Sequence, residues 1–167
     1  LPDHLRGLKE LVFFVPRNKA DETPPIEEMA KSKFLLKDPK GILVVPPGAG
    51  LLGRIENQFH IDFANMDLNI LSEVLPRFIL EKLGLAEELE LSIKQNLVEV
   101  KINGSLYTSL YSNEPNLKSL YILGCPIISA VACALAKATG KIVTLQKLQF
   151  SQDGQIKAEC NIIERRD

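Results

Sequence analysis

The sequence predicts an α+β fold, in which an antiparallel sheet of two hairpins is packed with three main helices. Apolar residues in the middle of the chain repeat at spacings of three, four and seven, which is typical of the buried side of a helix. From Glu88 onward they alternate with polar residues, as on a strand with one buried face. The alternating segments come in neighbouring pairs separated by short turns, which favours antiparallel pairing over a parallel, doubly wound sheet.

The first 40 residues are predicted to form an N-terminal extension, with a strand and a short helix, packed on a main domain at 41–167. The strand is expected at 10–16, where β-branched and aromatic residues end at a proline. The helix is expected after Thr23, which can cap a first turn that contains two prolines.

The main domain is predicted to open with a strand and a helix. A turn at 37–41 leads into an apolar strand at 42–45. After two prolines, a helix at 47–60 has apolar residues on one side.

The strongest helix signal lies at 67–83, where seven apolar residues form one stripe. Asp67 is expected to cap this helix and Gly84 to end it. Pro76 lies in its interior, so we expect a kink or break nearby.

Two hairpins are predicted to supply the sheet. The first, at 88–111, turns at Gln95-Asn96, and Asn103-Gly104 offers a second turn into a further strand at 105–111. The second hairpin occupies 141–164 and turns at 152–154.

A third helix is predicted at 126–139, between a proline that suits a first helical position and Gly140, which suits a C-terminal cap. It is apolar on nearly all sides and rich in small residues. Such a helix has to be buried on most sides.

The composition is that of an ordinary globular chain. Of 167 residues, 46% are hydrophobic and 25% charged, and the formal net charge is −1. Basic residues are scattered rather than clustered, so we expect no nucleic-acid partner.

The cysteines indicate neither a zinc site nor a disulfide framework. Cys125, Cys133 and Cys160 form no paired C-x-x-C motif, and only two histidines, His4 and His60, are present. We therefore expect no metal, and free thiols in a reducing interior.

We expect a cytoplasmic protein that is tethered to a membrane if a hydrophobic segment precedes it in a longer chain. No run of 18 apolar residues occurs in the sequence. The chain begins with Leu rather than Met, and its first ten residues are amphipathic, unlike a signal peptide.

Residues 48–53, GAGLLG, match the G-x-G-x-x-G spacing of dinucleotide-binding turns, with Gly48, Gly50 and Gly53. Two prolines separate this turn from the preceding strand, and Glu73, 20 positions on, lies inside a predicted helix. A tight turn with close packing is therefore the preferred interpretation, and nucleotide binding is an alternative.

Cys125 is the candidate for a reactive group, because Gly124-Cys125-Pro126 places a thiol at a helix N-terminus, where the helix dipole stabilises a thiolate. A nucleophile also needs a base, and no histidine is near in sequence. A buried structural cysteine is the preferred interpretation, and a thiol-dependent enzyme is the alternative.

Acidic residues Glu56, Asp62 and Asp67 are close in sequence, but they lack the histidine or the spacing that a metal site needs. We interpret them as a solvated face and a helix cap. Arg54, beside the glycine turn, can hold an anion or face solvent.

A ligand, if one binds, is expected where the start of helix 126–139 meets the turn at 46–52. Both places combine free N–H groups with apolar neighbours, as small-molecule pockets do. The alternative is that the two turns simply pack on each other or on a second subunit. The proposed ligand residues are Gly48, Gly50, Leu51, Leu52, Arg54, Cys125, Ile127 and Ile128.

Several short motifs between Gly41 and Glu164 carry a resemblance to known domains. They are Leu83-Gly84-Leu85, the strand EVKINGS, Cys125, Thr139-Gly140-Lys141, Ile156, Ala158, Cys160 and Ile162. With these motifs, the order of elements resembles that of the four-vinyl-reductase-like domains, whose superfamily includes nitric-oxide-sensing haem domains and vesicle-tethering subunits. The chain also resembles conserved archaeal proteins without an assigned function, some of them attached to membrane segments.

This resemblance implies a pocket for a small apolar ligand between helices and sheet, and a tendency to form homodimers. The chain has no histidine placed as an axial ligand and no Y-x-S-x-R motif, so haem is not expected and no cofactor is assigned. We therefore expect a non-catalytic small-molecule-binding or protein-interaction domain.

Overall fold

A computed structural model describes most of the chain, which divides into two compact units at Leu1–Pro46 and Pro47–Asp167. Each unit is described by itself. The described residues are 11–18, 24–31, 34–37, 39–113 and 118–164.

The first unit contains a small antiparallel sheet in the order β1-β3-β2. Its elements are β1 (Phe13–Pro16), α1 (Ile26–Lys31), β2 (Leu35–Lys37) and β3 (Lys40–Val44). Because β3 pairs with both other strands, the division between the units falls after Pro46 rather than at the predicted boundary after residue 40.

One element of this unit was missed by the sequence analysis, and one expectation cannot be compared with the structure. The short strand β2 was not predicted, and its three residues are too few to show an apolar period. The proposed cap Thr23 lies outside the described residues.

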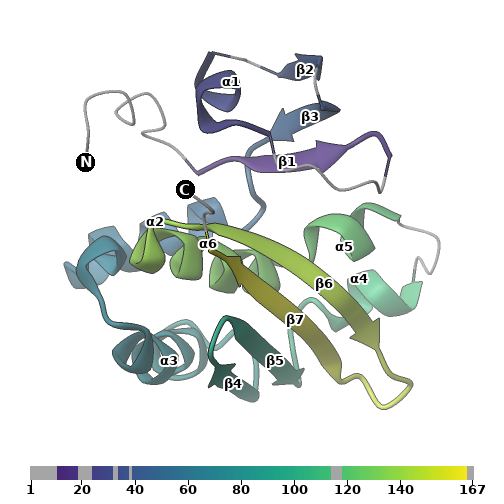
Figure 1. Cartoon of the computed structure of the whole chain (residues 1–167). Helices are drawn as coiled ribbons and strands as arrows, with labels where there is room; N and C mark the ends of the chain where they lie inside the picture. The colour runs from purple at the N-terminus through teal and green to yellow at the C-terminus, as the bar shows by residue number, and fades with distance from the viewer. Residues whose placement is uncertain (1–10, 19–23, 32–33, 38, 114–117, 165–167) are drawn as a thin grey trace. The chain divides into compact units, whose positions relative to one another are not determined.

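The second unit is built on a four-stranded antiparallel sheet in the order β4-β5-β7-β6, labelled in Figure 1. Its strands are β4 (Glu88–Lys94), β5 (Leu97–Asn103), β6 (Ile142–Phe150) and β7 (Ile156–Ile163). Both predicted hairpins supply this sheet, which confirms the α+β fold class.

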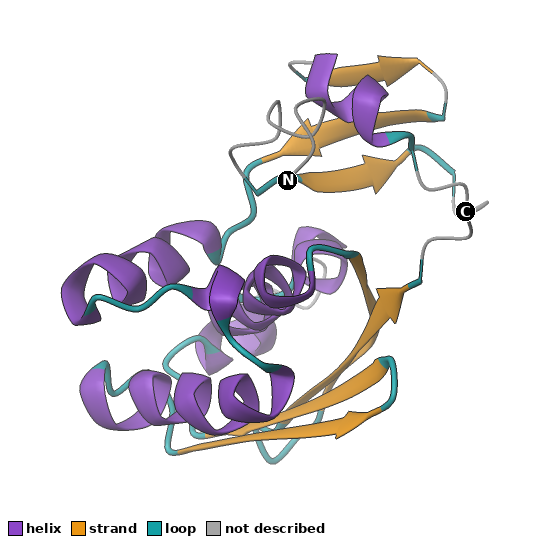
Figure 2. Ribbon diagram, turned by 60° about the vertical axis from the view of Figure 1, so that its left-hand side comes forward, coloured by secondary structure: helices purple, strands orange, loops and turns teal. Residues whose placement is uncertain are grey.

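One face of the four-stranded sheet is covered by helices, as Figure 2 shows. In β7 every second side chain is buried, and the residues between them are more exposed, because successive side chains point to opposite faces. The buried ones are Ile156, Ala158, Cys160 and Ile162.

The three main helices occupy the predicted regions. They are α2 (Ala49–Phe59), α3 (Leu68–Arg77) and α6 (Pro126–Thr139). The ends of α6 agree with the prediction because Pro126 begins the helix and Gly140 ends it with a left-handed φ of 64°.

The break expected near Pro76 takes the form of a π-helical turn at Phe78–Lys82, directly after α3. There the N–H of Leu83 donates to the carbonyl of Phe78, five residues back, at 3.0 Å. Asp67 caps α3 as predicted, since its carboxylate accepts from the N–H of Asn69.

The predicted strand at 105–111 was wrong: this region contains the helix α4 (Thr108–Asn113). Instead of continuing a strand ladder, the Ser105 hydroxyl accepts a hydrogen bond from the N–H of Tyr107, a local bond that favours helix initiation. A second short helix, α5 (Lys118–Leu123), precedes α6.

Strand β6 contains a bulge between Gln146 and Gln149, where its register with β7 shifts. Within the bulge, Lys147 has a positive φ of 48°. Its ammonium group lies 3.0 Å from the carboxylate of Glu159 on β7.

Among the described residues, the segment Lys118–Thr139 is long and apolar enough to cross a membrane by length and composition alone. Just over half, 56%, of the apolar 18-residue stretch within it is buried inside the protein. The core helix of a globular unit passes the same test, so the segment is weak evidence for a membrane span.

Candidate functional site

The glycine turn and the first turn of α6 are in direct contact. The N–H of Gly48 donates to the Ser129 hydroxyl at 2.9 Å, and this hydrogen bond is buried. A Cβ atom at Gly48 would overlap the backbone of Ser129 and Ala130, so only glycine allows this approach.

This contact brings together the two segments predicted to line a ligand pocket, but it is tightly packed. Leu51 is half-buried, whereas Gly50 and Arg54 are exposed on α2. The absence of room for a Cβ at Gly48 favours the packing alternative over a cavity at this contact. The fully buried members of the predicted set are Leu52, Cys125, Ile127 and Ile128.

The glycine turn also lacks the setting of a dinucleotide-binding fingerprint. The preceding strand, β3, is paired antiparallel on both sides. The amide of Gly48 is already bound to Ser129 rather than free for a phosphate. The geometry therefore does not favour the nucleotide alternative.

The Cys125 thiol is completely buried before α6. The backbone N–H of Cys125 donates to the Tyr111 hydroxyl at 2.9 Å, so a side chain of α4 satisfies the start of α6. Burial, followed by the neighbouring Cys125 thiol, raises the pKa of Tyr111 far above its ordinary value. A completely buried thiol is a poor nucleophile, because a substrate cannot reach it.

The other two thiols are also buried in the core. Burial raises the pKa of Cys133 to about 11 and that of Cys160 to about 12. Both thiols therefore stay protonated and unreactive at neutral pH.

The acidic residues singled out in the sequence stabilise local structure. Asp62 accepts hydrogen bonds from the N–H of Ala64 and the side chain of Asn65. Glu56 on α2 forms an ion pair of 2.7 Å with Lys137 on α6. Within the described ranges, no group of three or more His, Cys, Asp or Glu side chains is arranged to hold a metal ion.

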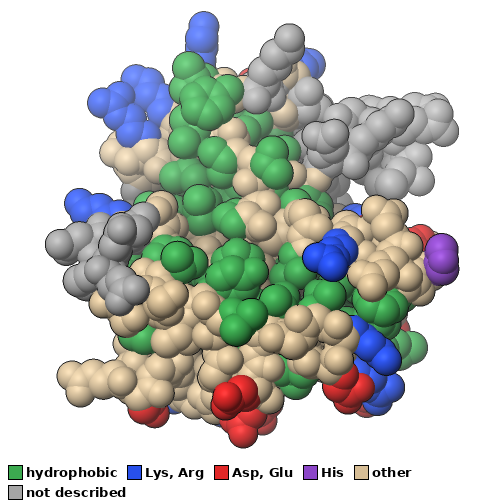
Figure 3. Space-filling model, turned by 180° about the vertical axis from the view of Figure 1, so that it is seen from behind, with side chains coloured by type: hydrophobic (Ala, Val, Ile, Leu, Met, Phe, Trp, Pro, Cys, Tyr) green, Lys and Arg blue, Asp and Glu red, His purple; other side chains and the backbone are tan. Residues whose placement is uncertain are grey.

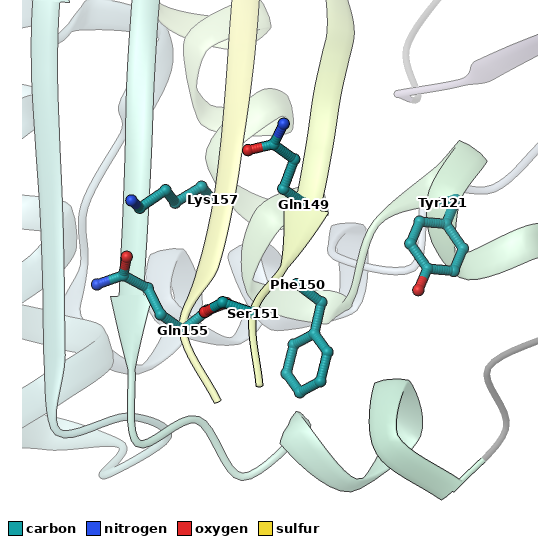
Figure 4. A pocket seen from close by; sticks show the side chains of 6 residues that line it. All are labelled: Tyr121, Gln149, Phe150, Ser151, Gln155 and Lys157. Carbon is teal, nitrogen blue, oxygen red and sulfur yellow. The ribbon is translucent and has the colours of Figure 1, made fainter. Parts of the chain in front are cut away.

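A surface pocket of ≈ 430 Å³ lies at the turn end of the β6–β7 hairpin, beside α5 (Figure 4). It was not predicted from the sequence. Its lining residues are Tyr121, Gln149, Phe150, Ser151, Gln155 and Lys157.

An aromatic cluster forms the apolar part of this pocket. The buried Tyr111 ring stacks on Phe150, with centroids 5.3 Å apart, and meets the edge of Tyr121 at 6.1 Å. The sequence contains three tyrosines, all between residues 107 and 121. This grouping of tyrosines was the sequence feature from which the pocket could have been suspected.

Polar side chains form the rest of the lining. The Gln155 amide donates to Asn103 at 3.0 Å, and Asn103 donates to Glu88 at 2.6 Å, so hydrogen bonds fix the orientation of Gln155. In the view of Figure 4, Gln155 and Lys157 extend away from Phe150 and Tyr121. The pocket therefore offers a polar side and an aromatic side rather than one point of convergence.

Comparison with known proteins gives a family but no activity. No curated protein and no solved structure matches the chain. A family model matches residues 1–161, which is most of the chain. The chain thus belongs to the family described as "Domain of unknown function (DUF7982)".

Proposed function

We propose that this chain is a non-catalytic protein-interaction module that binds its partner through the helices α4 and α5. The observation that carries this proposal is a group of four apolar side chains on these helices and just before α4, each between 40% and 66% exposed. We call them the α4–α5 surface. Its members are Leu106, Leu110, Tyr121 and Ile122.

The two helices that carry this surface are in contact. The ring contact between Tyr111 and Tyr121 joins α4 to α5, and Figure 1 draws the two helices next to each other. Isolated exposed apolar residues are common on proteins, whereas a contiguous group is typical of an interaction site. Apolar side chains (green) also reach the surface on the face drawn in Figure 3.

The pocket extends this surface. Tyr121 belongs to both. Tyr111 of α4 supports its ring, and Tyr111 in turn stacks on Phe150 of the sheet. A tyrosine held by packed neighbours loses little conformational entropy when it binds, and tyrosine is enriched among residues that dominate binding energy.

The thiol-enzyme alternative has less support. Cys125 is buried, and His60 is exposed at the C-terminal end of α2. A thiol-dependent enzyme needs a thiol and a base that face the same substrate.

The proposal is tested by charge substitution within the surface. Ile122→Glu is compared with Ile70→Glu, since Ile70 on α3 is the same residue type and at least as exposed. The partners retained by the tagged wild-type chain and by each variant are quantified by mass spectrometry, after circular dichroism has confirmed the fold. We expect a partner that binds the wild type and Ile70→Glu but not Ile122→Glu. Equal retention by both variants contradicts the proposal.

A further inference from the structure

The pocket combines two faces of one hairpin. Gln149 is paired with Lys157 and Phe150 with Ile156, so the first pair points to the open face of the sheet and the second to the helix-covered face. A compact ligand meets one face only. An extended chain that lies along the edge of the hairpin meets both, because its own side chains alternate.

The backbone of β6 is suited to such a chain. Strand β6 is at the edge of the four-stranded sheet. The N–H of Ser151 donates to the carbonyl of Gln155 at 3.0 Å, and in an antiparallel ladder bonded and non-bonded pairs alternate. The N–H and C=O of Phe150 therefore point away from β7, toward the open edge.

We propose that an extended peptide segment of a partner protein adds as a strand to the edge of β6 at Phe150. This inference rests on the proposed function and specifies how part of the partner binds. The segment alternates apolar and acidic residues. Its apolar side chains face Tyr121 and Phe150, and its acidic side chains lie beside Gln149, on the same face of the sheet as Lys157.

The charge of the segment follows from one row of residues across the open face of the sheet. Glu90, Lys101, Lys157 and Gln149 are register neighbours in this row. Lys101 is paired with Glu90 at 3.7 Å. Over the described part of the chain, no carboxylate lies within ion-pair distance of Lys157. An acidic residue on an added strand completes the row beyond Gln149.

The bulge in β6 limits how long the added strand can be. Between Gln146 and Gln149 the extra residue disrupts the regular ladder, and Lys147 sits there in a left-handed conformation. Regular pairing is therefore available from Gln149 toward the turn. A short segment is enough to fill the pocket.

Binding is measured by titrating the full chain with a short synthetic peptide in which leucine and glutamate alternate. The controls are a peptide of the same composition in two blocks and one in which leucine and lysine alternate. We expect the alternating acidic peptide to bind at least tenfold more tightly than either control and to slow hydrogen exchange of the Phe150 amide. Methylating the peptide nitrogens should abolish this binding, because main-chain hydrogen bonds are lost.

Two substitutions test the role of Lys157. Lys157→Glu is expected to weaken binding at least tenfold, whereas Lys157→Arg and the distant Lys82→Glu leave it nearly unchanged. Equal binding of the alternating and block peptides overturns the strand-addition mode, as does a β6 edge that sedimentation and exchange measurements find occupied by a second copy of the chain. If no peptide binds and Ile122→Glu still loses its partner, the interaction function stands and this mode of binding is wrong.

Discussion

The backbone nitrogen of Gly48 lies 2.9 Å from the hydroxyl oxygen of Ser129, a residue 81 positions away in the sequence. This hydrogen bond joins the start of α2 to the first turn of α6. It exists only because a residue without a side chain lets the two backbones meet.

Replacing Gly48 with Ala is expected to destabilise the protein by about 1–3 kcal/mol or more, because the added methyl group overlaps backbone atoms that cannot move aside. Gly50→Ala is the matched control, since a Cβ at Gly50 meets no atom within 4 Å. It should be neutral or stabilising by about 0.5–1 kcal/mol, as expected in a helix. Chemical denaturation measures both, and similar effects at the two positions contradict the packing argument.

Removing the Tyr111 hydroxyl by Tyr111→Phe is expected to cost about 1–3 kcal/mol, because the N–H of Cys125 at the start of α6 loses its acceptor. Tyr121→Phe keeps a ring in the same cluster but removes an exposed hydroxyl, so it should change stability little. Thermal unfolding followed by calorimetry compares the variants. A neutral Tyr111→Phe would show that water can replace the phenol.

The two core thiols predict a loss of stability in alkali. In the folded protein the pKa of Cys133 is raised from its ordinary 9.0 to about 11, and that of Cys160 to about 12, by burial. The two thiols therefore contribute fully to the free energy of unfolding below pH 9.0. This contribution is lost as the pH rises through the pKa values of the folded protein, since the thiols ionise first in the unfolded chain. For each thiol, the free energy of unfolding falls by at most about 1.4 kcal/mol per pH unit.

Cys160→Ala provides the comparison. Its free energy of unfolding, measured in guanidinium chloride from pH 8 to 11, should fall less steeply with pH than that of the wild type. Parallel curves for the two proteins would refute the assignment of a raised pKa to this thiol.

The ion pair between Glu56 and Lys137 is expected to couple α2 and α6 by about 1 kcal/mol, more than a fully exposed pair, because both side chains are largely shielded from water. A double-mutant cycle with Glu56→Gln and Lys137→Met isolates this energy. The exposed pair of Lys94 and Glu99 is a suitable control, and its coupling should be smaller and more sensitive to salt.

Elements with strong local signals were predictable from the sequence. Helix α6 was placed correctly because a proline and a glycine mark its ends, and the hairpins were found because one buried face imposes a period of two. The segment after Gly104 was misread because the Asn-Gly pair favours a hairpin, while the Ser105 hydroxyl bond that leads toward α4 is an equally short signal.

The candidate binding surface could not be predicted in the same way. Tyr121 and Phe150 come together only through the packing of Tyr111 between them, and no motif links their positions in the sequence. The buried contact at Gly48 was anticipated as one of two alternatives, but whether two apolar turns enclose a cavity or fill a core depends on side-chain volumes in three dimensions.

The bulge in β6 has a consequence for solubility. A regular nine-residue strand at the edge of a sheet is a template on which further chains can stack without limit, and such stacking leads to fibrils. The irregular backbone at Lys147 interrupts that template partway along. The bulge is thus expected to limit aggregation of the protein, while the edge of β6 beyond it still has room for the proposed short peptide.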